Sequence, residues 1–125
     1  MRLLLDTNAF LRLMGDRPLT RAVERALTRN DTERFVSIVT AWEIAIKHSL
    51  SVSATDVEAG ITAMAATLLP IKFQHLDELY RLPLYTNHRD PFDRLLIAQA
   101  IAEDLSMVSS DMRFGNYKRL RVLWD

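Results

Sequence analysis

Four acidic residues stand where an apolar run of the chain ends or where a helix is expected to begin. If the apolar runs are parallel strands, their carboxyl ends meet at one edge of a sheet, and the four carboxylates converge there. Carboxylates packed this closely raise one another's pKa unless a cation neutralises them, so the pattern predicts a metal-dependent enzyme. The four residues are Asp6, Glu43, Asp93 and Asp111.

The elements that must position these acids alternate along the chain. Strands separated by helices predict an α/β fold with a mainly parallel sheet, because parallel neighbours need crossover connections. The strands are expected at residues 2–5, 35–39, 70–73, 105–108 and 121–124. The helices are expected at residues 9–14, 18–30, 40–50, 53–68 or 69, 74–82 and 90–104.

Composition limits the class of protein. The 125 residues fit a single domain, 1–125. With 16 basic and 16 acidic residues the net charge is zero, which argues against coating nucleic acid by bulk charge and leaves local binding. The absence of cysteine leaves oxygen or imidazole as metal ligands. No apolar run is long enough for a membrane span or a secretory segment, so a cytoplasmic location and no membrane partner are expected.

Each acid also has a purely structural interpretation. Asp90, directly before Pro91, is expected to cap the following helix and not to bind metal. Glu43 and Asp93 each stand three residues after a potential N-cap, Thr40 or Asp90, which is the spacing of a capping box. The other two acids could cap the turns after their strands. Capping does not explain why three of the acids follow the carboxyl ends of predicted strands. Parallel sheets bind their ligands at this edge.

The sequence resembles the PIN-domain ribonucleases and, among them, the VapC-type toxins of bacterial type II toxin–antitoxin pairs. The resemblance covers essentially the whole chain and agrees in the order and spacing of its motifs. It rests on the segments Leu3–Asn8, Ser37–Ile44, His88–Ala100 and Val108–Phe114.

This resemblance implies a three-layer α/β/α domain whose central, mainly parallel sheet has four to five short strands. It implies that the four acids bind one or two Mg²⁺ or Mn²⁺ ions in an endoribonuclease that needs no protein nucleophile. We expect Asp6 and Asp93 to be the main ligands and Asp111 to bind directly or through water. Glu43 is expected to position water or to act as an outer ligand.

Polar residues next to the acids are expected to line the site or to cap the backbone; they are Thr7, Asn8 and Ser109. His88 lies in a polar loop and is expected to be solvated. Trp42 and Trp124 lie in apolar segments and are expected in the core. Tyr117 is a candidate for stacking on a base.

Basic side chains near the acids are candidates for contact with the RNA backbone. The alternative is a solvated surface, which we favour for Arg94. The candidates are Arg94, Arg113, Lys118 and Arg119.

The partners implied by the resemblance are RNA such as tRNA or rRNA, a cognate antitoxin, and a second copy in a homodimer. The apolar faces of the helices expected at 18–30 and 56–68 are candidate contact surfaces, although the sequence does not separate them from core.

Three other classes of protein share some of these features. A phosphoacceptor receiver domain needs an acid after its central strand and a late lysine, but no lysine lies between Lys72 and Lys118. A phosphatase of the haloacid-dehalogenase kind needs an aspartate where Asn8 stands. The remaining alternative is a catalytically inactive PIN-like module that binds RNA or protein.

Overall fold

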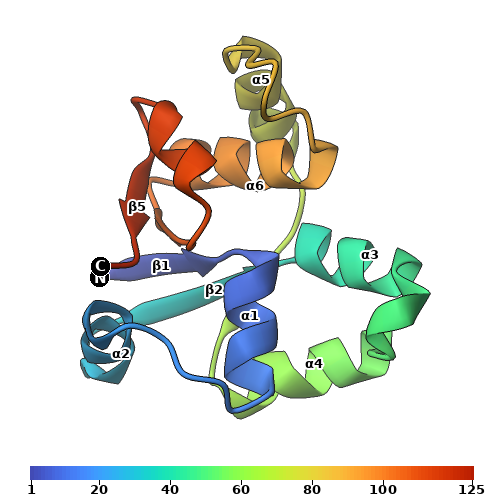
Figure 1. Ribbon diagram of the computed structural model, residues 1–125, viewed down its shortest axis with the longest axis vertical. Helices are drawn as coiled ribbons and strands as arrows, with labels where there is room; N and C mark the ends of the chain where they lie inside the picture. The colour runs from blue at the N-terminus through green and yellow to red at the C-terminus, as the bar shows by residue number, and fades with distance from the viewer.

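A five-stranded, entirely parallel sheet forms the centre of the computed structural model, which describes residues 1–125 (Figure 1). The strand order is β3-β2-β1-β4-β5. The strands are β1 (Arg2–Leu5), β2 (Glu33–Ser37), β3 (Thr67–Leu69), β4 (Ser106–Val108) and β5 (Arg121–Leu123). The α-helices are α1 (Thr7–Met14), α2 (Arg21–Thr28), α3 (Ile38–Ile46), α4 (Ala54–Ala63), α5 (Phe73–Arg81) and α6 (Pro91–Ala102). Short 3₁₀ turns η1 (His48–Leu50) and η2 (Met112–Asn116) complete the chain.

Helices cover both faces of the sheet, which confirms the three-layer α/β/α prediction. In β1, Leu4 packs into the apolar cluster that contains α6, whereas Leu3 and Leu5 pack into the cluster that contains α1 and α2. All three leucines are fully buried, as alternation in a central strand requires. In Figure 1, α5 and α6 lie on one side of the sheet and α1, α2 and α4 on the other.

The third strand is Thr67–Leu69, so its prediction at residues 70–73 was wrong. Helix α4 ends at Ala63, and Ala65 then adopts a left-handed φ of 53°, which turns the chain into the strand earlier than its apolar composition indicates. Pro70 ends the strand because proline has no backbone N–H for the ladder. Residue 73, placed in that strand by the prediction, is the first residue of α5.

The second strand ends at Ser37, two residues earlier than predicted. The Ser37 side chain accepts a hydrogen bond from the Val39 backbone N–H and caps α3, which therefore begins at Ile38. Thr40 lies inside the helix, so the predicted capping box between Thr40 and Glu43 was wrong. The strand propensity of this β-branched run is overridden by the cap and by tertiary packing.

Other helix starts follow their caps. Asp90 accepts a hydrogen bond from the Asp93 backbone N–H and caps α6, with Pro91 at its first position, as predicted. Helix α2 begins at Arg21 after its cap Thr20, three residues later than predicted.

None of the helices combines the length and the apolar character that crossing a membrane requires.

Candidate metal centre

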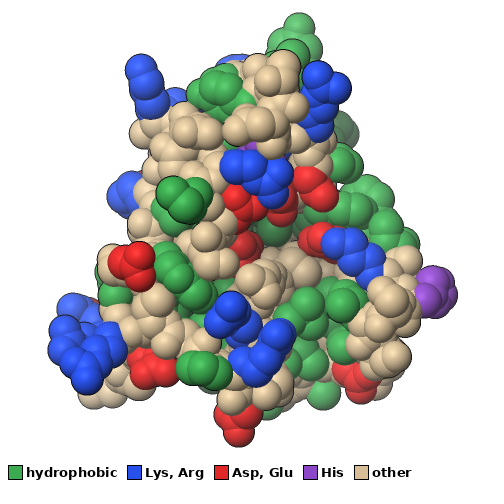
Figure 2. Space-filling view, in the orientation of Figure 1, with side chains coloured by type: hydrophobic (Ala, Val, Ile, Leu, Met, Phe, Trp, Pro, Cys, Tyr) green, Lys and Arg blue, Asp and Glu red, His purple; other side chains and the backbone are tan.

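The four predicted acids lie around the carboxyl edge of the sheet. Strand β1 pairs with both β2 and β4, so the segments that leave these three strands begin side by side. Asp6 follows β1, Glu43 lies in the helix that follows β2, and Asp111 follows β4. Asp93 lies in the first turn of α6. Figure 2 shows acidic side chains gathered in a hollow on this face, with basic side chains on its rim.

Asp6 is the most deeply placed acid that has no basic partner. Its side chain caps α1 by accepting a 2.8 Å hydrogen bond from the Ala9 backbone N–H, and the residue is only 6% exposed. Burial raises its pKa from 3.8 to about 6, against the opposing effect of hydrogen bonds from Ser109 and Ala9. The charges of Asp93 and Asp111 raise that pKa further. The Asp6 carboxylate is therefore buried without a basic side chain to offset its charge.

Asp93 is in a similar state. Burial is the main cause that raises its pKa, and the charges of Asp90 and Glu43 act in the same direction. The opposing effect comes from His88, whose Nε2 lies 3.1 Å from Asp93 Oδ2. No arginine or lysine forms an ion pair with Asp93.

Glu43, by contrast, is neutralised by the chain itself. Lys47 Nζ lies 2.6 Å from Glu43 Oε2, one helical turn away, and Thr7 donates a 2.6 Å hydrogen bond to Oε1. The Thr7 hydroxyl also lies 3.2 Å from that of Thr40. Glu43 is buried, and the hydrogen bond between Lys47 and Glu43 is the main reason that the pKa of Lys47 is raised.

Asp111 has its own cation as well. Arg113 forms a forked contact with it, with Nη2 2.6 Å from Oδ2 and Nε 3.0 Å from Oδ1. These hydrogen bonds hold the pKa of Asp111 below its usual range. Arg113 also donates to the Asn87 carbonyl oxygen, so the guanidinium bridges η2 and the loop before α6.

The charges thus divide the four acids into two pairs. Glu43 and Asp111 have lysine or arginine partners, whereas Asp6 and Asp93 remain close to each other with raised pKa values and no lysine or arginine in an ion pair with them. Carboxylate and hydroxyl oxygens are the donors that Mg²⁺ and Mn²⁺ prefer. The donor set fits a hard divalent cation, with Asp6 and Asp93 as the groups that gain most from it.

The polar residues beside the acids differ in what they contact. Thr7 holds Glu43, and Ser109 donates to Asp6 while it also accepts from the Asp111 backbone N–H. Asn8 instead reaches the Ser110 hydroxyl at 3.5 Å. The structure therefore brings two of these three residues to the carboxylates.

Sequence reasoning missed His88, which is 1% exposed and not solvated. One ring nitrogen faces Asp93, and the other lies 3.1 Å from the Tyr117 hydroxyl. His88, Asp93 and Asp111 each offer one ligand atom within 4.8 Å of the others. The available signal was the short spacing between His88 and Asp93 in the segment that carries the resemblance.

Three further predictions were also wrong. Arg94 neither covers the helix surface nor reaches solvent as an RNA contact, because it is buried and donates a 2.7 Å hydrogen bond to the Pro83 carbonyl oxygen. Tyr117 is 2% exposed, so its ring is not available to stack on a base. Trp42, predicted in the core, is 52% exposed and packs edge-on against Phe92.

The remaining basic candidates lie on the surface. Arg119 forms two 3.0 Å hydrogen bonds with Glu78, so its charge is already paired. Lys118 lines a cavity of about 430 Å³ together with Arg81 and Tyr85.

Trp124 is half-buried against the cluster around α1 and α2, close to its predicted place.

The structure is that of a parallel α/β protein with four carboxylates around the carboxyl edge of its sheet. The family comparison matches the PIN domain over residues 3–120. The chain belongs to the PIN-domain family, as the sequence resemblance predicted.

Several solved structures with the same fold are of VapBC proteins or of other toxin–antitoxin complexes. VapBC2 from Rickettsia felis, bound to a DNA fragment from its promoter, has a TM-score of 0.77 at 16% identity and covers 100% of both chains. DNA-bound VapBC from Salmonella typhimurium has a TM-score of 0.72 at 16% identity, covering 98% of this chain and 97% of that one. VapBC-1 from nontypeable Haemophilus influenzae has a TM-score of 0.66 at 19% identity, with 98% and 97% coverage. No curated protein matched the sequence.

Proposed function

We propose that this PIN-domain protein is a Mg²⁺- or Mn²⁺-dependent endoribonuclease that acts as the VapC-type toxin of a toxin–antitoxin pair. The observation that carries the proposal is the pair Asp6 and Asp93, two carboxylates at the carboxyl edge of the sheet with raised pKa values and no lysine or arginine partner. Family membership supports a nuclease, and the solved complexes with the same fold support the toxin role.

Asp6 and Asp93 would hold the ion, with Asp111 as a direct or water-mediated ligand and Glu43 placing a water. When bound, a divalent ion supplies an activated water and a positive charge opposite the scissile phosphate. The chain contributes orientation. Ser109 and the Ala9 backbone N–H fix the Asp6 carboxylate, while Thr7 and Lys47 fix Glu43.

The substrate proposed is single-stranded or looped RNA, for example in tRNA or rRNA, since bases splayed from a loop leave the backbone open to an exposed metal centre. Among the basic candidates, Arg113 lies at the acids and is 45% exposed in its side chain. An ion bound by Asp111 would weaken its contact with Arg113 and release that guanidinium for a phosphate. Lys118 and Arg119 lie further along the C-terminal segment, where they would steer the RNA backbone.

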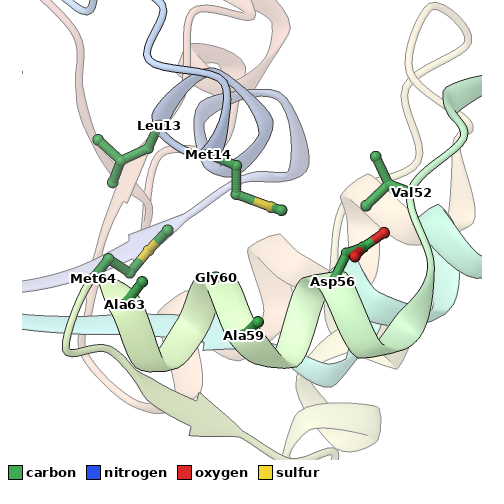
Figure 3. A pocket seen from close by; sticks show the side chains of 8 residues that line it. All are labelled: Leu13, Met14, Val52, Asp56, Ala59, Gly60, Ala63 and Met64. Atoms are coloured by element: carbon green, nitrogen blue, oxygen red, sulfur yellow. The ribbon is translucent and has the colours of Figure 1, made fainter.

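A cognate antitoxin is the proposed protein partner. Of the two helix faces considered from the sequence, that of α2 is core, since Val23, Ala26 and Leu27 are buried. The surface of α4 is different, because it forms one wall of a groove of about 480 Å³ whose other wall is α1 (Figure 3). Its lining residues are Leu13, Met14, Val52, Asp56, Ala59, Gly60, Ala63 and Met64. An apolar antitoxin segment fits this groove, and a basic side chain of the same partner fits the acidic hollow.

A homodimer is proposed through α5. Phe73, Leu76 and Tyr80 follow the i, i+3, i+7 spacing of one helix face, and Phe73 and Tyr80 are each 90% exposed. Leu84, just beyond the helix, is 88% exposed. An exposed apolar stripe of this kind is typical of an interaction surface.

The decisive experiment for the enzyme is a cleavage assay on total RNA with Mn²⁺, followed by sequencing of the cleaved ends. We expect discrete cleavage that chelation abolishes and that Asp93→Asn lowers by two or more orders of magnitude. Asp77→Asn, an exposed acid on α5, is the matched control and should cleave normally. Unchanged cleavage by Asp93→Asn contradicts the proposal, and an inactive wild type that still binds RNA supports the inactive-module alternative.

A further inference from the structure

A chain of four buried or partly buried side chains ends on Asp93. Arg94 Nη1 donates to the Tyr117 hydroxyl at 3.4 Å, and that hydroxyl lies 3.1 Å from His88 Nδ1. His88 Nε2 then lies 3.1 Å from Asp93 Oδ2. The members come from the loop before α6, from α6 itself and from the segment after η2, so the chain joins three separate parts of the fold.

The partners of the Tyr117 hydroxyl determine which nitrogen of His88 carries the proton. A guanidinium has only donors, so Arg94 uses a lone pair of the hydroxyl and cannot accept its hydrogen. The remaining partner is His88 Nδ1, which must therefore accept. The ring proton of His88 then lies on Nε2 and is donated to Asp93 Oδ2.

The ring of His88 has little freedom to leave this position. It lies 5.3 Å from the Phe114 ring and 5.6 Å from the Tyr117 ring, measured between centroids, and it is 1% exposed. The Arg94 guanidinium is itself fixed by the 2.7 Å bond to Pro83. Buried polar networks in which every member is satisfied hold their groups in one geometry.

We propose that His88 and Tyr117 are positioning residues that orient the Asp93 carboxylate, with Oδ2 held by His88 and Oδ1 left free to bind the metal ion. The role rests on the metal centre of the proposed function. Carboxylates that bind metals are held in this way by partners outside the coordination sphere, whose loss typically costs about 10- to 100-fold in metal affinity or activity.

The same geometry argues against His88 as a metal ligand. His88, Asp93 and Asp111 lie within reach of one ion, but an Nε2 that carries a proton has no lone pair to offer. His88 Nδ1 is occupied by Tyr117 on the side of the ring away from Asp93. His88 therefore acts on the metal only through Asp93.

The first test is the tautomer of His88 in the metal-free protein, read from long-range ¹H–¹⁵N correlation spectra. The expected pattern is a proton on Nε2 and a bare Nδ1. In Tyr117→Phe, which keeps the ring but removes the hydroxyl, we expect this preference to weaken. Tyr85→Phe is the control, because the Tyr85 hydroxyl donates to the Asn116 carbonyl oxygen and has no bond to His88. A wild-type ring protonated on Nδ1 overturns the proposal.

The second test is Mn²⁺ affinity by calorimetry, with electron spin-echo spectroscopy of the bound ion. His88→Phe should weaken binding about 10- to 100-fold and Tyr117→Phe about 3- to 10-fold, while Tyr85→Phe binds as the wild type does. His88→Gln, which retains an N–H donor, should recover part of the loss. The spin-echo spectrum of the wild type should show no ¹⁴N coupling from a bound imidazole, and such a coupling overturns the positioning role.

The outcomes also separate this role from the enzyme proposal. A wild type that binds no Mn²⁺ overturns the metal centre and the role of His88 together. A wild type that binds Mn²⁺ and cleaves RNA, with His88→Phe and Tyr117→Phe binding equally well, overturns the positioning role alone.

Discussion

Lys47 reaches back one turn of α3 and places its Nζ 2.6 Å from Glu43 Oε2. The lysine side chain is 49% exposed, whereas that of Glu43 is 7% exposed. The ammonium group therefore reaches from the surface to a carboxylate buried in the acidic hollow. The charges of Asp90 and Asp93 also act on Lys47 and raise its pKa. Lys47 therefore provides one positive charge where a metal ion would provide two.

Lys47→Met should tighten Mn²⁺ binding, because a competing positive charge at the acids is removed; about threefold is expected after solvent screening. Stability without metal should fall by about 1 kcal/mol, since the buried Glu43 loses a partner. Calorimetry and thermal unfolding measure the two effects. Arg81→Met, which breaks the exposed i,i+4 pair with Asp77, is the control and should change neither. Weaker Mn²⁺ binding in Lys47→Met would show that the hold of Lys47 on Glu43 matters more to the site than the positive charge that it places there.

Asp6→Asn should stabilise the metal-free protein at neutral pH. The folded-state pKa of Asp6, about 6, lies above its ordinary 3.8, so the folded state binds the proton more tightly than the unfolded state does. The contribution of Asp6 to stability is therefore greatest below pH 4, falls as the pH rises from 4 to 6, and carries the full penalty above 6, at most about 3 kcal/mol. Asparagine keeps the cap on Ala9 without the charge.

Denaturant unfolding between pH 4 and 8 in a chelating buffer measures this effect. The decline of the wild type between pH 4 and 6 should be reduced in Asp6→Asn, and added Mg²⁺ should stabilise the wild type more than the variant. Asp77→Asn serves as the control. A variant that is less stable than the wild type at pH 7.5 contradicts the burial penalty assigned to Asp6.

Glu103→Gln should destabilise the protein at neutral pH by about 1 to 3 kcal/mol and reduce its sensitivity to acid. Glu103 Oε2 accepts a hydrogen bond from His75, which is completely buried, and this contact is the main cause that lowers the pKa of Glu103. A lowered pKa contributes stability above the unfolded value of 4.5, and this is lost as the pH falls below it. Unfolding at pH 3 to 7 should show the two proteins converging in acid. Glu58→Gln, on the exposed side of α4, should behave as the wild type.

Arg113→Met should raise KM for RNA more than it lowers kcat, because the proposed phosphate contact is lost while the acids remain. The salt dependence of KM should become shallower, as expected when one basic contact is removed. Steady-state cleavage at several salt concentrations measures this. Arg119→Met, which removes a guanidinium paired with Glu78, should have the smaller effect. Identical salt slopes for Arg113→Met and the wild type would exclude the contact.

Ala59→Glu should weaken capture of a coexpressed cognate antitoxin by placing a charge in the groove between α1 and α4 (Figure 3). Truncating or charging a central apolar contact typically costs about 1 kcal/mol or more in affinity. Thr62→Glu, on the same helix but outside the groove, is the matched control. Equal yields of copurified antitoxin for both variants would show that the groove is not part of the interface.

The acids could be predicted from the sequence because each one has a local signature. Asp6 follows a run of buried leucines, and Asp93 follows a helix cap with a proline beside it. The boundaries of strands and helices were less predictable where one apolar run contains the end of a strand and the start of a helix. The run after Phe35 passes from β2 into α3 at Ser37, and only the side-chain cap on Val39 marks the change.

The charge state of the site could not be predicted in the same way, because it depends on contacts between distant residues. Tyr117 meets His88 across 29 positions, and Thr7 meets Glu43 across 36. Arg94 looks like a surface residue in the sequence, yet its guanidinium is the anchor of a buried chain of hydrogen bonds. No local pattern distinguishes such side chains from solvated ones.

The order of the strands determines when the acidic edge of the sheet can assemble. Every pairing in the sheet is parallel, and β1 joins β4, so Asp6 meets Asp111 only after the chain has been synthesised as far as residue 111. Sheets built from such distant pairings assemble late, because loop closure must precede their contacts. A chain that ends before β4 contains three of the four acids but lacks Asp111 and the strand that positions it. The proposed metal centre is thus completed only once β4 has paired with β1.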